Sequence, residues 1–308
     1  MKRSKITILL AIVLGMTFHS CLDLEPQDQL GGKNMWTSVN DYKQFANTFY
    51  SWTRDFSSVV YDGTHSDKRS DLITYQSYNE FSRGINSIPS SDANYTDNYK
   101  HIRRTNLLLQ NAEAYAKPED IKQYIGEAYF FRAYSYFDLL QLYGDVIITK
   151  KPLDITDPEM KVKRNDRSEV VDLIIDDLNH AVENLPAFKE LTTEEEGRIS
   201  KEGAQAFLSR VALYEGTWQK SRNGNQNTQR SANLLDIAAK AARTVIDAKY
   251  GYTFRLFGTD SETKILGDSA QKYMFILENE KSNPAGIKKS SNHEYIFARR
   301  HDQVLASI

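Results

Sequence analysis

The feature that most limits the fold of this chain is a long helical segment without a polar face. Residues 121–143 read IKQYIGEAYFFRAYSYFDLLQLY, and apolar side chains would lie on nearly every side of a helix drawn through them. Such a helix has to be covered on all sides by other elements. Pro118 suits the first turn and Gly144 suits a C-terminal cap, so we expect a central helix from about residue 119 to 143. Its rings are expected in the core: Tyr129, Phe130, Tyr134, Tyr136 and Phe137.

Several other segments have apolar residues at intervals of three and four, which is the spacing of a helix. They are residues 38–52, 95–115, 167–185, 200–218 and 232–249. Two short apolar stretches near the C-terminal end, MFILEN at 274–279 and EYIFARR at 294–300, are candidate strands. The pattern as a whole predicts an all-α fold.

Small residues recur at fixed places in two of the predicted helices. They are Ala204, Leu208, Ala212 and Gly216, followed after a polar loop by Ala238 and Ala242. Small side chains let the two helices of a hairpin approach closely, and each hairpin leaves an apolar face that a neighbouring hairpin has to cover. The spacing indicates tetratricopeptide-like helical hairpin repeats, with long irregular loops between some of the helices.

The first twenty residues have the composition of an export signal. Three basic residues precede the uncharged run ITILLAIVLGM at 6–16, which is too short to span a membrane as a helix. A small residue, Ser20, precedes Cys21, the only cysteine of the chain. This arrangement predicts a bacterial lipoprotein, with residues 1–20 as signal peptide, Cys21 as the lipidated residue and residues 21–35 as a tether. An ordinary cleaved signal with a free cysteine is the alternative.

The charge and the motifs of the chain exclude several classes of protein. Removal of three basic residues with the signal leaves 36 basic against 41 acidic residues, which makes nucleic acid an unfavourable partner. The sequence contains none of the common hydrolase, protease or nucleotide-binding motifs. We therefore expect no enzyme, no cofactor and no metal, although Asp62, His65, Asp67 and Asp71 offer donor atoms in one loop. The acidic pair at 176–177 is expected on a solvated helix face.

Residues 53–93 form a long polar stretch that we expect to be irregular. Sugars bind to flat rings through their C–H faces and to amide and guanidinium groups through their hydroxyls. This part of the chain and its flanks carry that mixture of side chains. The candidate ligand residues are Trp52, Tyr75, Tyr78, Asn79, Phe81, Arg83, Asn86 and Tyr95.

The order of segments resembles the SusD/RagB family of Bacteroidetes outer-membrane lipoproteins. Matching stretches are CLDLEP, WTSVNDYKQFANTFY, YTDNYKHIRRTN and, above all, EAYFFRAYSYFDLLQLYGDV. They are followed in the family's order by RSEVVDLIIDDLNHAVENLP, RISKEGAQAFLSRVALYEGTW and AAKAARTVIDAKYGYTF. The match runs from residue 21 to about 254 and more loosely to 308.

The resemblance implies a lipid-anchored protein on the outside of the outer membrane. Members bind glycans, or peptides in some branches, without catalysis and pass them to a TonB-dependent, SusC-like channel on which their repeat helices pack. Ligand loops precede the helix that matches YTDNYKHIRRTN in starch-binding relatives, which agrees with the position of the candidate residues. The function implied for this chain is capture of an oligosaccharide and its delivery to such a channel in polysaccharide utilisation.

Two departures from the family pattern bear on this expectation. The family has proline soon after the YGDV element, whereas Val146 is followed here by Ile147 and Ile148. Members are usually much longer, so residues 36–308 are expected to correspond to the N-terminal helical-repeat half, with the C-terminal half missing. Alternatives to glycan capture are a repeat module that docks a partner protein without a ligand of its own, a peptide-binding member, and a surface glycoside hydrolase.

Overall fold

A computed structural model describes residues 35–54, 72, 80–85, 87–222, 228–277 and 279–298, with the side chains of residues 81 and 82 left out. Across these residues the regular elements are helices, and one isolated antiparallel bridge joins Val146 to Asn165. The α-helices are α2 Val39–Asn47, α3 Glu80–Arg83, α4 Ala93–Glu113, α5 Lys122–Tyr143, α6 Arg167–Asn184, α7 Lys201–Arg222, α8 Thr228–Ile246 and α9 Ala270–Tyr273. Short 3-10 helices are η2 Thr48–Trp52, η5 Pro118–Ile121, η6 Pro158–Lys161, η7 Phe188–Glu190, η8 Lys264–Ser269 and η9 Lys289–Ser291.

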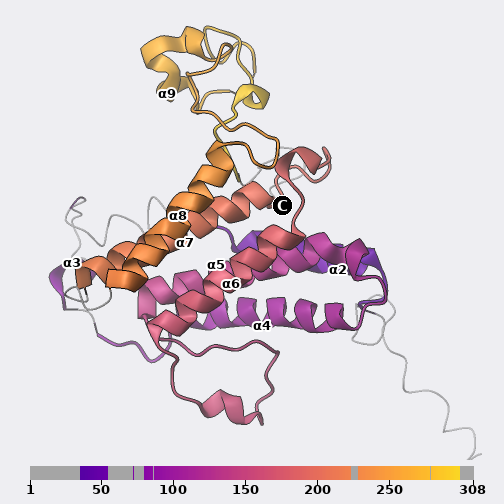
Figure 1. The fold of residues 1–308 in the computed structure, drawn as a ribbon, viewed down its shortest axis with the longest axis vertical. Helices are drawn as coiled ribbons and strands as arrows, with labels where there is room; N and C mark the ends of the chain where they lie inside the picture. Colours follow the sequence, from indigo (N-terminus) through magenta and orange to yellow (C-terminus); the bar gives the residue numbers. More distant parts are fainter. Residues whose placement is uncertain are drawn as a thin grey trace, which may run out of the picture.

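The long helices pack in the order in which they occur in the chain. α4 lies against α5, α5 against α6, α6 against α7 and α7 against α8, while α2 lies beside α4 and α5 (Figure 1). The all-α prediction and the positions of the long helices are confirmed. α2 begins where Ser38 and Asp41 form a capping box, in which the Ser38 hydroxyl accepts from the Asp41 N–H and the Asp41 carboxylate accepts from the Ser38 N–H.

The strand predictions at 274–279 and 294–300 are wrong for the residues that the structure describes. Met274 caps the C-terminus of α9, and residues 294–298 are irregular. Part of each stretch packs without strand pairing, because Leu277 is buried in a small apolar cluster and the half-buried Phe297 packs against Phe130 of the main core. A short apolar run indicates burial, but it does not by itself indicate a strand.

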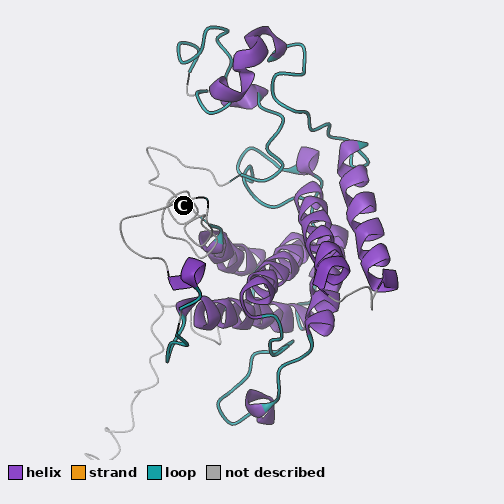
Figure 2. Cartoon of the chain, turned by 90° about the vertical axis from the view of Figure 1, so that its left-hand side faces the viewer, coloured by secondary structure: helices purple, strands orange, loops and turns teal. Residues whose placement is uncertain are grey.

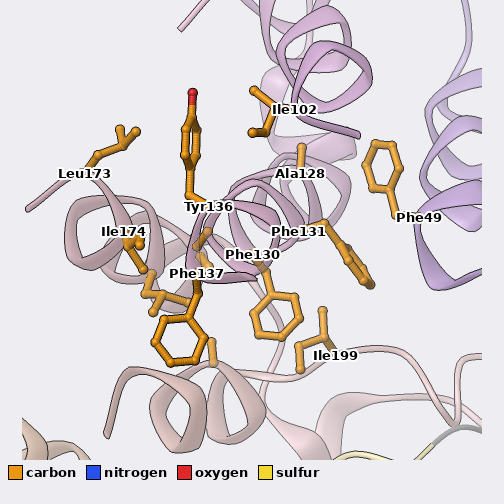
Figure 3. Close-up of a cluster of buried hydrophobic side chains, with 14 of the residues drawn as sticks. Phe49, Ile102, Ala128, Phe130, Phe131, Tyr136, Phe137, Leu173, Ile174 and Ile199 are labelled. Carbon is orange, nitrogen blue, oxygen red and sulfur yellow. The ribbon is translucent and has the colours of Figure 1, made fainter. Parts of the chain in front are cut away.

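The main core surrounds α5, as its apolar sequence requires. Figure 3 shows side chains from several elements gathered around this helix, with Phe49 from η2, Ile102 from α4 and Ile174 from α6. Phe130, Tyr136 and Phe137 are buried, while Tyr129 and Tyr134 are half-buried and pack against the core. α5 ends at Gly144, which has a φ of +73° that L side chains rarely adopt.

The α7–α8 hairpin is closely packed through small residues. A Cβ atom built on Gly216 of α7 would lie 3.0 Å from the Leu235 side chain of α8, which is tighter than ordinary contact. Two serine hydroxyls donate to backbone carbonyl oxygens across the hairpin, Ser231 to Gly216 at 2.7 Å and Ser209 to Ala238 at 2.9 Å. Ala204, Leu208, Ala212 and Ala238 are buried and Ala242 is half-buried, so the small-residue pattern did predict this hairpin.

A small lobe of residues 255–294 lies apart from the helical body in both views (Figures 1 and 2). It has its own apolar cluster, made of Phe257, Leu266, Ala270, Leu277 and Ile287. The two ends of the lobe meet, because the Arg255 N–H donates to the His293 carbonyl at 3.1 Å and the Phe257 N–H donates to the Glu294 carboxylate at 2.8 Å. The chain then returns to the body at Phe297.

Candidate functional site

Trp52 is the first of the candidate ligand residues that the structure describes. It ends η2, and its half-buried ring stacks on the His101 imidazole of α4 with 4.1 Å between centroids and 14° between planes. The ring also contacts Phe49 at 4.7 Å and the edge of Phe131 at 5.9 Å. Trp52 is therefore a partly exposed edge of the core, and the face that meets His101 is already occupied.

Charged and amide groups adjoin this stack. The Arg54 guanidinium lies 2.6 Å from the Asp138 carboxylate of α5, and the Asn98 amide of α4 donates to the other oxygen of the same carboxylate at 2.9 Å. The three side chains tie the chain after η2 to both α4 and α5. Ring, imidazole and guanidinium thus lie together at the surface, above the buried Asn98 amide. Rings and guanidinium groups are among the groups that sugar recognition uses.

His101 is neutral at physiological pH in this environment. Burial beside Trp52 lowers the pKa of His101 to about 4, because desolvation disfavours the imidazolium, and the attraction of Asp97 only partly opposes this. A neutral imidazole offers one donor and one acceptor nitrogen.

Tyr95 lies near the start of α4 in a cluster of phenol rings. Its ring is 4.8 Å from the Tyr99 ring and 5.2 Å from the Tyr143 ring, with the latter pair perpendicular. The Tyr143 hydroxyl donates to the carboxylate of Asp92, the N-cap of α4, at 2.6 Å. Tyr95 and Trp52 therefore contact the same half of α4, about 9 Å apart along the helix axis, since Tyr95 and His101 are six residues apart.

These contacts fix both ends of the long polar stretch at one place. The chain leaves the helical body at Arg54, which is paired with Asp138, and re-enters it at Asp92, which is bonded to Tyr143. Asp138 and Tyr143 are both in the last turns of α5. We call the surface formed by the first half of α4 and the end of α5 the loop-bearing face.

The remaining candidate residues are only partly described. Arg83 ends α3 and is exposed. Phe81 lies in the same helix, but its side chain is outside the description. Tyr75, Tyr78, Asn79 and Asn86 lie outside the described residues, as do Cys21 and the loop with His65. The structure therefore places Trp52 and Tyr95 on the loop-bearing face and leaves the roles of the set as predictions.

A buried polar network behind this face was not expected. The Arg132 guanidinium of α5 forms two hydrogen bonds with Asp177 of α6, at 2.6 and 2.8 Å, and a third with the Asn106 amide oxygen of α4 at 2.8 Å. Asp177 is fully buried, so the expectation of a solvated face at 176–177 is wrong for this residue and right for the exposed Asp176. The signal that could have found the network is Arg132 in the middle of a helix that has no polar face, since a buried cation requires a paired anion.

Two charge-assisted hydrogen bonds favour the ionised form of this buried pair. Burial alone would lower the pKa of Arg132, but the Asp177 carboxylate raises that pKa above its ordinary value. Asn106 uses its amide hydrogens on the Thr149 and Lys151 carbonyls, at 3.0 and 3.3 Å. The network thereby connects α4, α5 and α6 to the chain that follows α5.

A second surface feature lies between α6 and α8. This α6–α8 groove has a volume of about 600 Å³, an apolar floor that includes Ile175 and Ile237, and a polar lining of acids and amides. The polar residues are Asp172, Asp176, Asn179, Gln229, Arg230 and Asn233. The Arg230 guanidinium already has hydrogen-bond partners within the groove, because it donates to Asp172 at 2.8 Å and to the Ser168 carbonyl at 3.0 Å.

The described residues contain neither a metal-binding cluster nor a membrane-spanning helix. No group of three or more His, Cys, Asp or Glu side chains among them could hold a metal ion. None of the helices described is both long enough and apolar enough to cross a bilayer.

A family model described as "Starch-binding associating with outer membrane" matches residues 22–213. The match covers more than half of the chain and includes α2, α4, α5 and α6. The chain belongs to the SusD-like family. The family's description names binding and association with the outer membrane, and it names no reaction, in agreement with the expectation of a binding protein rather than an enzyme.

Two curated relatives support the same family assignment. SusD-like protein P38 of Formosa agariphila is 28% identical over 69% of this chain and 42% of its own length. SusD-like protein P2 of the same organism is 26% identical over 96% of this chain and 59% of its own length. The chain therefore spans about half the length of these relatives.

Solved structures agree on the fold. A SusD-like protein from Bacteroides fragilis superposes with a TM-score of 0.62 at 22% identity, covering 91% of this chain and 48% of that one. A chain crystallised with xylogluco-oligosaccharide superposes with a TM-score of 0.54 at 21% identity, covering 84% of this chain and 44% of that one. At this level of identity the likeness shows a shared helical fold and no shared ligand.

Proposed function

We propose that this SusD-like protein is a cell-surface lipoprotein that captures an oligosaccharide and delivers it to a TonB-dependent outer-membrane channel. Cys21 carries the lipid, and the loop-bearing face carries the ligand. Binding is reversible and involves no bond cleavage. The observation that carries the proposal is that both ends of the polar stretch containing most of the candidate ligand residues are fixed on one aromatic and charged face.

The chemistry of that face suits a sugar better than a strongly charged ligand. The Arg54 cation is already paired with Asp138, and a ring and a neutral imidazole adjoin it. Such groups satisfy hydroxyls without a large net field. The family's starch-binding description and the xylogluco-oligosaccharide found with one structural neighbour support a glycan as the ligand class.

Affinity gel electrophoresis tests the binding. Residues 21–308 with Cys21→Ser are run through native gels that contain starch, xyloglucan or one of several other polysaccharides. We expect retardation on at least one glycan, with no shortening of that glycan in product analysis. No retardation on any glycan, or cleavage by the purified protein, would contradict the proposal.

A set of variants then locates the ligand. The triple variant Tyr78→Ala, Arg83→Ala and Tyr95→Ala should lose retardation, because it removes two rings and a guanidinium from the set of candidate ligand residues. The double variant Arg222→Ala and Tyr295→Ala changes exposed residues of the same kinds elsewhere and should keep it. Equal behaviour of the two variants would argue against this face as the binding site.

Delivery is tested separately. The lipidated chain, purified from outer membranes in mild detergent, should bring with it a TonB-dependent channel identified by peptide sequencing. Cells without the chain should grow more slowly on the retained glycan and normally on its monosaccharide. Normal growth on both carbon sources would refute delivery without affecting the binding result.

The α6–α8 groove favours one alternative, a repeat module that docks a partner protein without a ligand of its own. Its apolar floor and its amides, Asn179, Gln229 and Asn233, could hold an extended backbone. A chain that binds the channel but is retarded by no glycan would support this alternative.

A further inference from the structure

One loop of the molecule carries large apolar side chains far from either core. Residues 150–164, here the 150–164 loop, connect the end of α5 to α6 and project from the helical body in both views (Figures 1 and 2). Ile155 is 92% exposed, Met160 51% and Val162 45%. None of the residues in this loop belongs to either apolar cluster. Exposed apolar side chains gathered in one segment indicate a contact site for another surface.

The base of the loop is held firmly. The Tyr136 hydroxyl of α5 accepts a hydrogen bond from the Thr149 N–H at 2.8 Å, and Asn106 donates to the Thr149 and Lys151 carbonyls. Asn106 is in turn fixed by the buried Arg132. The loop therefore projects from a rigid support that is part of the core.

Contacts within the loop also restrain its conformation, and one of its acids is ion-paired. Lys151 pairs with Glu159 at 3.0 Å, and the Asp157 carboxylate accepts from the Asp154 N–H at 2.7 Å. Four exposed cations remain without an ion pair to any residue that the structure describes. They are Lys150, Lys161, Lys163 and Arg164.

We propose that the 150–164 loop contacts an anionic membrane surface, with Ile155, Met160 and Val162 in the headgroup layer and the four cations at lipid phosphates. Apolar side chains that enter the interface and cations that meet anionic headgroups are the two contributions that hold peripheral segments on membranes. An acidic protein surface would match the cations equally well, but would not require three exposed apolar side chains in one loop.

The inference rests on the proposed Cys21 anchor, which supplies the nearby membrane. The fourteen residues 21–34 can span at most about 50 Å when extended, so an anchored chain stays within reach of the bilayer. A loop that binds weakly from solution then acts at high effective concentration and fixes the orientation of the protein.

Vesicle flotation tests the inference. The probe is phosphatidylcholine vesicles with and without phosphatidylglycerol, and the protein is residues 21–308 with Cys21→Ser, which has no lipid of its own. We expect flotation with the anionic vesicles that exceeds flotation with the neutral ones by about tenfold and falls in high salt. Replacement of Ile155, Met160 and Val162 by serine should lower the bound fraction by about tenfold.

A matched control variant distinguishes membrane binding by the loop from non-specific hydrophobic binding. Leu213, Ile246 and Ile265 are 51%, 63% and 76% exposed on other elements, and their triple replacement by serine should leave flotation unchanged. Far-UV circular dichroism and the melting temperature confirm that both triple variants are folded. Absence of flotation, an equal loss in both triple variants, or full flotation of the loop variant would each overturn the proposal.

The vesicle-flotation test of the loop and the glycan-retardation test of the proposed function can each give a negative result without the other. The loop variant keeps every residue of the loop-bearing face, so it should be retarded by glycans like the parent chain. A chain that floats with vesicles but binds no glycan would refute the proposed function and leave the membrane contact standing.

Discussion

The surroundings of α5 and the α7–α8 hairpin are both closely packed, but by opposite means. Bulky rings and buried ion pairs surround α5, where Arg132 meets Asp177 and Arg198 meets Glu127 at 3.0 Å. The hairpin packs through Gly216, alanines and serine hydroxyls, and no ion pair joins α7 to α8 in the part of the chain that the structure describes.

This difference means that the α5 region supports the binding surfaces, whereas the packing of α7 on α8 contributes only rigidity. The polar groups around α5 extend to the loops, since Asn106 holds the base of the 150–164 loop and Asp138 holds the start of the polar stretch at Arg54. The groups that pack α7 on α8 set only the distance between these two helices, and the ion pairs of the hairpin run to α6, where Glu215 meets Arg167 and Arg230 meets Asp172. Damage to the first region should therefore reach the binding surfaces, whereas damage to the second should reduce stability alone.

The largest expected effect comes from breaking the network at Arg132. Arg132→Met leaves the Asp177 carboxylate buried and unpaired, so the free energy of unfolding should fall by about 3–5 kcal/mol in urea titrations followed by circular dichroism. The double variant Arg132→Met and Asp177→Leu should recover most of this loss, because neither charge is then left alone.

A surface pair provides the control for this experiment. Lys240 and Asp236 are exposed on α8 at 2.6 Å, and Lys240→Met should cost less than about 1 kcal/mol. If Arg132→Met costs as little as Lys240→Met, the network does not hold the α5 region together.

A smaller effect is expected from overpacking the hairpin. Gly216→Val places a branched side chain against Leu235, so the free energy of unfolding should fall by about 1–3 kcal/mol. Thr217→Val places the same side chain at the next position, which is exposed. It should change the free energy of unfolding by less than about 0.5 kcal/mol. Glycan retardation of the folded Gly216→Val variant should be unchanged, and a loss of binding there would contradict the separation of the two regions.

The smallest expected effect is a dependence of stability on pH at His101. Its native pKa of about 4 lies below the ordinary value of 6.5, so the unfolded chain takes up a proton first as the pH falls. Stability is therefore lost progressively between about pH 6.5 and 4. His101→Phe keeps a ring against Trp52 and should flatten the fall in melting temperature over this interval. An unchanged slope would show that other groups carry the acid sensitivity.

The helices and the hairpin could be predicted because their signals are local. Apolar spacing located α4 to α8, and the small residues at 204–216 predicted the close contact with α8. The strands at 274–279 and 294–300 could not be told from other buried apolar runs by spacing. Asp177 was misjudged because its burial depends on Arg132, which lies 45 residues away.

The sequence indicates a candidate region for the site, which stays a prediction, and it does not indicate a geometry. The residue mixture pointed to residues 52–95, and the ends of that stretch do meet on one face. The stack of Trp52 on His101 and the pair of Arg54 with Asp138 could not be predicted, because each joins side chains from different elements whose relative placement the local pattern does not contain.

The most direct test of the account compares glycan binding by the loop-bearing face with binding by the α6–α8 groove. A groove variant with Asp176→Ala, Asn179→Ala and Asn233→Ala is run in affinity gels beside the variant with Tyr78→Ala, Arg83→Ala and Tyr95→Ala. The account predicts that the groove variant is retarded like the parent chain and that the face variant migrates freely. Retardation of the face variant together with free migration of the groove variant would contradict it.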